Sequence, residues 1–142
     1  MVAAMRVHVT NAAVQEAACR ALGDITIGAG KQLSMHIQVV VDAGTLPQIV
    51  AAMHAHAANA VVQAAACRAL GGITYGNNAC CDARSQVAAD AGALSQIVAA
   101  MRAHATSAVV QVAACRALGD IILGGDPQRE ARRQAAVDAG AL

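Results

Sequence analysis

The sequence has no tryptophan or phenylalanine, one tyrosine, two prolines and few charges. Charged residues make up 13% of the 142 residues and the net charge is +1, so the chain offers little field to attract nucleic acid. It also has almost no aromatic surface on which bases could stack. No uninterrupted apolar run reaches the ~18 residues of a membrane span. We therefore expect neither nucleic acid nor a membrane as a partner.

Hydrophobic residues nonetheless make up 57% of the chain, which excludes a disordered protein. Alanine, the best helix former, is the most frequent residue, whereas the aromatic residues that favour strands are nearly absent. The expected fold is therefore all-α, with a thin core of small aliphatic side chains. The N-terminus shows no secretion signal and the five cysteines suggest no disulfide framework, so we expect a cytoplasmic protein.

The strongest signal in the sequence is a repeat of 48 residues. The hexapeptide Ala-Cys-Arg-Ala-Leu-Gly at 18–23 recurs at 66–71 and at 114–119. The tripeptide Asp42-Ala43-Gly44 recurs twice with the same step. Self-similarity at a fixed period of this length is typical of solenoid proteins.

Each period predicts three helices, of which the first is clearest at 127–138. Asp126 can cap this helix, Pro127 suits its first turn and Gly140 ends it. The second helix is clearest at 94–104, where apolar residues recur with the i, i+3, i+4, i+7 spacing of an amphipathic helix.

The third helix starts after Ser107 and runs to about Leu123. Asn11 and Asn59 occupy the same repeat position as Ser107, and all three are residue types that cap helix N-termini. Apolar residues at helical spacing predict the buried side of this helix. They are Val110, Ala114, Leu118 and Ile121.

A short first helix followed by two longer helices, with Asp-Ala-Gly between the first and second, resembles the armadillo repeat. Residues 87–98 and 109–121 carry this resemblance. It implies a right-handed α-solenoid of three-helix units over the whole chain. The period is somewhat longer than is usual in the family. The surplus, around Tyr75 to Arg84, predicts a longer loop or an extended first helix.

We expect one repeat domain over residues 1–142, beginning and ending within a repeat. Residues 1–30 supply the second and third helices of a partial repeat, 31–78 and 79–126 are full repeats, and 127–142 form a lone first helix. The two ends are therefore complementary in sequence. Exposed apolar ends favour either head-to-tail association or helix exchange, unless the chain is a piece of a longer solenoid. The apolar residues expected at these ends are Val2, Val7, Val9, Val14, Val137 and Leu142.

The polar side of the third helices is the best candidate for function. Its residues fall at i and i+4 spacing on one helix face, and the arginine recurs in each period. They are Glu16, Arg20, Asp24, Arg68, Gly72, Arg116 and Asp120. The alternative is that these arginines and acids form only solvated i, i+4 pairs, each worth ~0.2–0.5 kcal/mol.

The resemblance implies that this surface lines a concave groove. In armadillo solenoids a Trp and an Asn four residues later bind extended peptides there. The Trp position holds arginine in all three units, and the Asn position holds Asp24, Gly72 and Asp120. An ionised Asp only accepts hydrogen bonds, whereas an amide also donates them, so the family's peptide clamp is not preserved. The resemblance implies a protein or peptide partner for a non-catalytic scaffold.

The cysteines and histidines have structural explanations. Cys19, Cys67 and Cys115 share one repeat position and are expected in the core. The adjacent Cys80-Cys81 lacks the two-residue spacing of a metal or redox motif. The histidines that recur at the end of the second helix favour the negative helix terminus there. These are His8, His56 and His104.

No set of residues predicts catalysis, a metal site or a cofactor. The segment 28–31 is Gly-rich before a lysine, but it lacks the first glycine and the Ser or Thr of a phosphate-binding loop. The charge run 129–133 is expected to be a solvated helix face that could also meet an acidic partner. The sequence therefore predicts a protein that is not an enzyme.

Overall fold

A computed structural model describes residues 1–27, 31–76 and 78–141. Within these ranges the chain forms nine α-helices and no strand. The helices are α1 Val2–Val7, α2 Ala12–Ile25, α3 Lys31–Asp42, α4 Thr45–Ala55, α5 Ala60–Thr74, α6 Ala79–Asp90, α7 Ala93–Ala103, α8 Ala108–Ile122 and α9 Arg129–Asp138.

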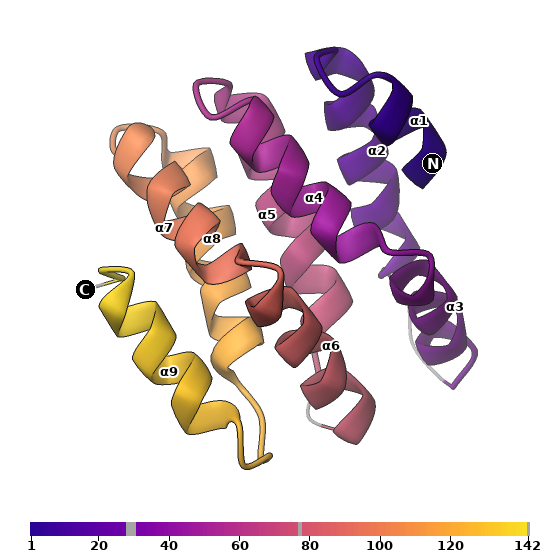
Figure 1. Ribbon diagram of the computed structural model, residues 1–142, viewed down its shortest axis with the longest axis vertical. Coiled ribbons are helices and arrows are strands. Elements are labelled where there is room, and N and C mark those ends of the chain that lie inside the picture. The colour runs from indigo at the N-terminus through magenta and orange to yellow at the C-terminus, as the bar shows by residue number, and fades with distance from the viewer. Residues whose placement is uncertain (28–30, 77, 142) are drawn as a thin grey trace.

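The helices stack in parallel rows (Figure 1). In one row α5 packs between α2 and α8, and in a second row α4 packs between α1 and α7. The first helices of the units, α3, α6 and α9, lie along the lower side of the stack in Figure 1. This arrangement confirms the all-α solenoid. Two points stay predictions. They are the right-handed twist of the solenoid and the division into repeats after residues 30, 78 and 126. The prediction that the first helices are shorter than the second helices is wrong for α3 and α6, which have 12 residues each where α4 and α7 have 11.

Helix boundaries follow the predicted capping with two differences. The Asn11 and Asn59 side chains accept backbone N–H bonds as expected, whereas Ser107 is an N-cap without a side-chain bond. Helix α9 begins at Arg129, two residues later than predicted. The Asp126 carboxylate accepts a bond from the Gln128 backbone at 2.7 Å and so holds a turn ahead of the helix.

The repeated Asp-Ala-Gly tripeptide ends one helix and begins the next. Gly44 and Gly92 have φ values of 76° and 85°, in the left-handed region that glycine enters without steric cost. Each is the N-cap of the second helix that follows. The surplus residues of the longer period extend the first helix rather than the loop, since α6 begins directly after its Asn78 cap.

A glutamine at one repeat position joins the second and third helices of each unit, and it is buried in the first two units and partly buried in the third. Gln63 Nε2 donates to the Met53 carbonyl at 2.7 Å and to the His56 carbonyl at 2.9 Å. Gln15 and Gln111 make the same pair of bonds in their units. These bonds satisfy carbonyls that the end of a helix leaves without an intrahelical partner. Glutamine thus links the end of the second helix to the third helix in each unit.

The histidines lie at the C-terminal ends of the second helices as predicted, and two of them also reach a carbonyl of the preceding unit. His56 Nε2 lies 2.8 Å from the Val9 carbonyl, and His104 Nε2 lies 2.8 Å from the Ala57 carbonyl. A carbonyl can only accept, so the ring nitrogen donates in both cases. Each bond joins one repeat to the preceding one at the same place.

The structure also corrects two predictions of burial. Cys19 and Cys67 are fully buried as expected, but Cys115 is exposed because no further third helix packs against α8 in this chain. Arg132, expected on a solvated face, is buried. Its guanidinium forms an ion pair with Asp126 at 2.8 Å and donates to the Ile121 carbonyl at 2.9 Å.

Candidate protein-binding groove

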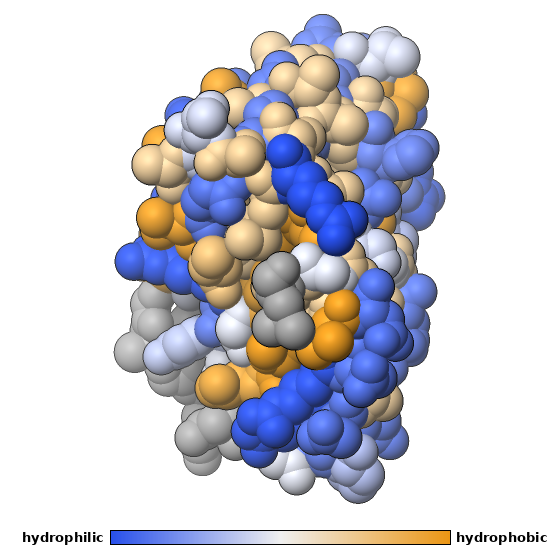
Figure 2. All heavy atoms as spheres, turned by 90° about the vertical axis from the view of Figure 1, so that its left-hand side faces the viewer, coloured by the Kyte–Doolittle hydropathy of each residue, from blue (hydrophilic) through white to orange (hydrophobic). Residues whose placement is uncertain are grey.

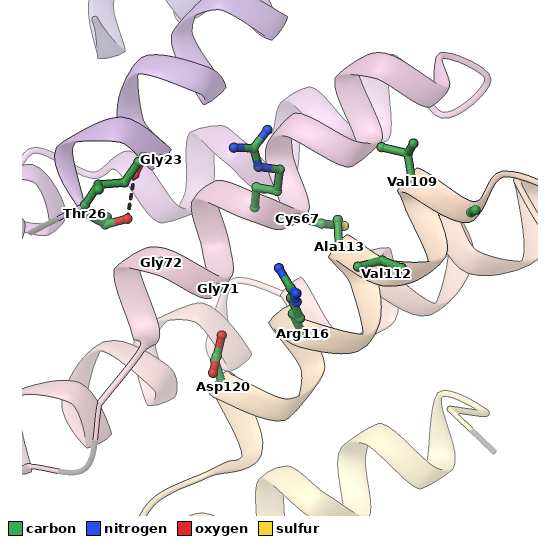
Figure 3. Close-up of a pocket in the computed structure, with 13 residues that line it drawn as sticks. Gly23, Thr26, Cys67, Gly71, Gly72, Val109, Val112, Ala113, Arg116 and Asp120 are labelled. Atoms are coloured by element: carbon green, nitrogen blue, oxygen red, sulfur yellow. Dashed lines mark hydrogen bonds between the residues drawn. The ribbon is translucent and has the colours of Figure 1, made fainter.

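The third helices α2, α5 and α8 bring Arg20, Arg68 and Arg116 to one exposed surface. Between these helices lies a hollow of about 530 Å³. Figure 3 shows Arg116 and Asp120 of α8 on one side of it and Gly71 and Gly72 of α5 on the other. We call this hollow, with the two smaller ones beside it that Arg20 and Arg68 line, the third-helix groove.

Two glycines in the middle helix shape the floor of the groove. A Cβ atom at Gly72 would collide with the hydroxyl of Thr26, which caps the end of α2. A Cβ atom at Gly71 would lie 3.4 Å from the Ala117 Cα of α8. Glycine at these two positions therefore lets the neighbouring third helices approach α5 closely, and the backbone of α5 is left without side chains at the hollow.

The wall of the groove is apolar and exposed. Ile27 at the end of α2 is 73% exposed, and Val109 and Val112 on α8 are 68% and 53% exposed. Val61 lines the adjoining hollow and is also largely exposed. Apolar side chains that line a concave surface together with a few polar groups are typical of a binding site.

The charges of the groove are unevenly compensated. Arg20 is paired with Glu16 at 3.2 Å on the exposed surface of α2. Arg68 and Arg116 form no ion pair within the described residues. The lining contains three arginines and one acid, Asp120. Burial raises the pKa of the Asp120 carboxyl, and the nearby Arg116 opposes that shift.

The structure brings most of the predicted groove residues together. Arg68, Gly72, Arg116 and Asp120 line the main hollow, and Arg20 lines the smaller ones. Glu16 and Asp24 lie outside these linings. Glu16 forms a solvated ion pair with Arg20, as the alternative interpretation of this surface predicts. Asp24 is exposed near the end of α2.

The sequence reasoning missed the apolar part of the site. Val109 and Val112 are three residues apart on α8 and lie outside its buried stripe, so their spacing could have indicated an exposed apolar face. Ile27 follows the end of α2, where no periodicity applies.

The residues predicted at the two ends are largely exposed. Val7, Val9 and Val137 are exposed, whereas Val2 and Val14 are partly buried. Leu142 lies outside the described residues.

Other kinds of site find little support in the described part of the chain. No group of three or more His, Cys, Asp or Glu residues there could hold a metal ion. Cys81 is buried and its thiol donates to the Tyr75 carbonyl at 3.2 Å, while Cys80 is exposed. None of the helices in these ranges is long and apolar enough to cross a membrane.

The family model described as the LRRK2 ARM repeat matches residues 1–126. The chain belongs to the LRRK2 ARM repeat family. Comparisons with curated proteins and with solved structures found no match. Armadillo folds are typically non-enzymatic helical scaffolds for protein interaction. In this chain the candidate residues for such a role lie on the exposed surface of α2, α5 and α8.

Proposed function

We propose that this chain is a non-catalytic scaffold that binds a segment of a partner protein in the third-helix groove. One observation carries the proposal. A single hollow combines exposed Val109 and Val112 with two arginines that form no ion pair within the described residues. Arginine is enriched in protein interfaces, and a concave surface lined by apolar side chains with a few polar groups is typical of a binding site.

The charge of the groove indicates the chemistry of the bound segment. Arg20 is paired with Glu16, and Arg116 lies near Asp120. The excess of positive charge along the lining is therefore centred on Arg68. A guanidinium presents a planar fork of donors that matches a carboxylate oxygen pair. The hollow of about 530 Å³ beside Val109 and Val112 has the size for a side chain of the partner. We infer an extended segment that carries acidic residues and at least one aliphatic side chain.

Arg68, on the middle third helix, is the arginine that matters most for the proposed binding. It lines all three hollows, and glycine stands four residues after it, where the other two repeats have an aspartate. Its positive charge is therefore the least compensated of the three.

The test uses fluorescent peptides of alternating glutamate and valine, with lysine replacing glutamate in the control peptide. Arg68→Glu is expected to weaken binding of the acidic peptide by more than about tenfold, measured by fluorescence anisotropy at low salt. Arg102→Glu, the same charge change at an exposed position of α7 in the other row, is the matched control and should leave binding nearly unchanged. Equal losses in both variants, or equal binding of the lysine peptide, would contradict the proposal.

A further inference from the structure

Each third helix is followed by a large apolar residue that stays exposed. Ile27, Tyr75 and Leu123 are separated by the 48-residue step and come after the ends of α2, α5 and α8. Their exposed fractions are 73%, 70% and 53%. Exposed apolar side chains need no explanation when they are scattered singly, but these three share one repeat position. We call them the apolar row.

The exposure of the apolar row does not depend on the ends of the stack. Figure 2 faces the end formed by α7, α8 and α9, where other apolar residues are open to solvent. A neighbouring repeat would cover such an end, so exposure there does not indicate a partner. Tyr75 follows α5, which packs between α2 and α8, and it is exposed all the same. The row is thus open to solvent even where third helices lie on both sides.

The apolar row lies on the same helix face as the groove arginines. Tyr75 comes seven residues after Arg68, and Leu123 comes seven residues after Arg116. Positions seven residues apart lie two turns apart on one face of a helix. The helical geometry extends to both residues, because the backbone N–H of each donates to the carbonyl four residues earlier, at 2.8 Å for Tyr75 and 2.9 Å for Leu123. These helices therefore present an arginine and, about 10 Å further along the axis, an apolar side chain.

The main hollow of the groove reaches from the arginines to the apolar row. Arg68, Arg116 and Ile27 all line it. Between them on α8 lies Asp120, shown in Figure 3. A Cβ atom at Gly71 would lie 3.1 Å from its Oδ2, so this carboxylate lies against the α5 backbone. A partner's carboxylate directed at the apolar row would meet Asp120 and apolar surface, whereas one directed the opposite way meets guanidinium groups.

We propose that the apolar row binds the aliphatic side chains of the same acidic segment that the arginines bind, with the segment extended across the third helices between the two rows. This rests on the proposed function of the third-helix groove and names the sequence pattern that the groove recognises. Successive side chains of an extended chain point to opposite sides. A segment in which acidic and aliphatic residues alternate thus directs its carboxylates to the arginines and its aliphatic side chains to the apolar row.

The dimensions of the groove suit such a segment. An extended chain with side chains on both sides is about 10 Å wide, as the spacing of stacked sheets shows. The arginines and the apolar row are separated by about the same distance along each helix. Three packed third helices span about 16–20 Å, which roughly six extended residues cover.

The test compares three acidic peptides of about eight residues, long enough to cross the three helices. Valine alternates with glutamate in the first, and serine replaces valine in the second. The third has the composition of the first, with its glutamates and valines in two separate blocks. Binding is measured by fluorescence anisotropy at low salt. The alternating glutamate–valine peptide is expected to bind at least about fivefold more tightly than either of the others.

Tyr75→Ser tests the apolar row at its middle member. It is expected to weaken binding of the alternating glutamate–valine peptide by about five- to tenfold and to leave binding of the glutamate–serine peptide unchanged. The matched control is Val39→Ser, which removes a 69% exposed apolar side chain from α3, outside the groove lining, and should change neither. Circular dichroism checks that both variants keep their helix content.

Tyr75 also provides a readout that needs no label, because it is the single tyrosine of a chain without tryptophan. Saturation with the unlabelled glutamate–valine peptide is expected to change the tyrosine emission of the wild-type chain. The glutamate–serine peptide should change it less, since serine does not cover the ring.

The outcomes separate this inference from the proposed function. If Arg68→Glu weakens binding but Tyr75→Ser keeps the full preference for valine over serine, the inference is overturned while the groove stands. A wild-type preference for the block peptide over the alternating one overturns it in the same way. If the wild-type chain binds none of the peptides, or Arg68→Glu binds them as the wild type does, the groove itself fails and the inference fails with it.

Discussion

Helices α5 and α8 are two copies of nearly the same sequence in different surroundings. Helix α5 has a third helix on each side, whereas α8 has one on a single side within this chain. Cys67 on α5 is fully buried, but Cys115 at the same repeat position is exposed. The comparison teaches that the repeat position determines which way a side chain points, and that the neighbouring repeat determines whether it is buried.

The strongest test of this comparison places the same large side chain at two equivalent glycines, one on α5 and one on α8. Gly71→Leu is expected to destabilise the fold by about 3 kcal/mol or more, because Ala117 of α8 occupies the space the side chain needs. Gly119→Leu should instead stabilise by about 0.5–1 kcal/mol, since leucine favours a helix more than glycine does and nothing lies near.

The measurement is the urea unfolding of both variants and of the wild-type chain at one protein concentration. Equal destabilisation by the two substitutions would show that α8 is as enclosed as α5, and the comparison would be wrong.

A smaller effect is expected at the histidines between repeats. His56→Ala removes the hydrogen bond to the Val9 carbonyl and should cost about 1 kcal/mol. His8→Ala, at the same repeat position on the outer face, should leave the free energy of unfolding unchanged. Two-state urea unfolding of both variants under the same conditions measures this. A cost at His8 that matches the cost at His56 would contradict the account.

The sequence predicted the framework of the fold because each part of it depends on local residues. The 48-residue step places the Asp-Ala-Gly turns, and Asn11 and Asn59 mark where third helices begin. The buried stripe of α8 follows from helical periodicity alone. The three arginines of the groove were found because they recur at one repeat position.

Features that depend on distant neighbours could not be predicted in this way. Arg132 lies in a charge run that indicates a solvated face, but it packs against the end of α8, where the Ile121 carbonyl accepts from it, and forms an ion pair with Asp126. The close approach of Thr26 to Gly72 joins two helices from different repeats. The 48-residue pattern also predicted burial at Cys115, because the pattern alone assumes a neighbouring repeat on both sides.

The central claim is that α5 is enclosed by third helices on both sides and α8 on one side. Cysteine alkylation of the native chain is the most direct test of this claim. Burial raises the pKa of the Cys67 thiol to about 12, so this thiol is both covered and protonated at pH 8. In dilute solution, iodoacetamide followed by peptide mass spectrometry is expected to modify Cys115 and Cys80 rapidly and to leave Cys19 and Cys67 unmodified until the chain is unfolded. Modification of Cys67 as fast as Cys115 would contradict the account.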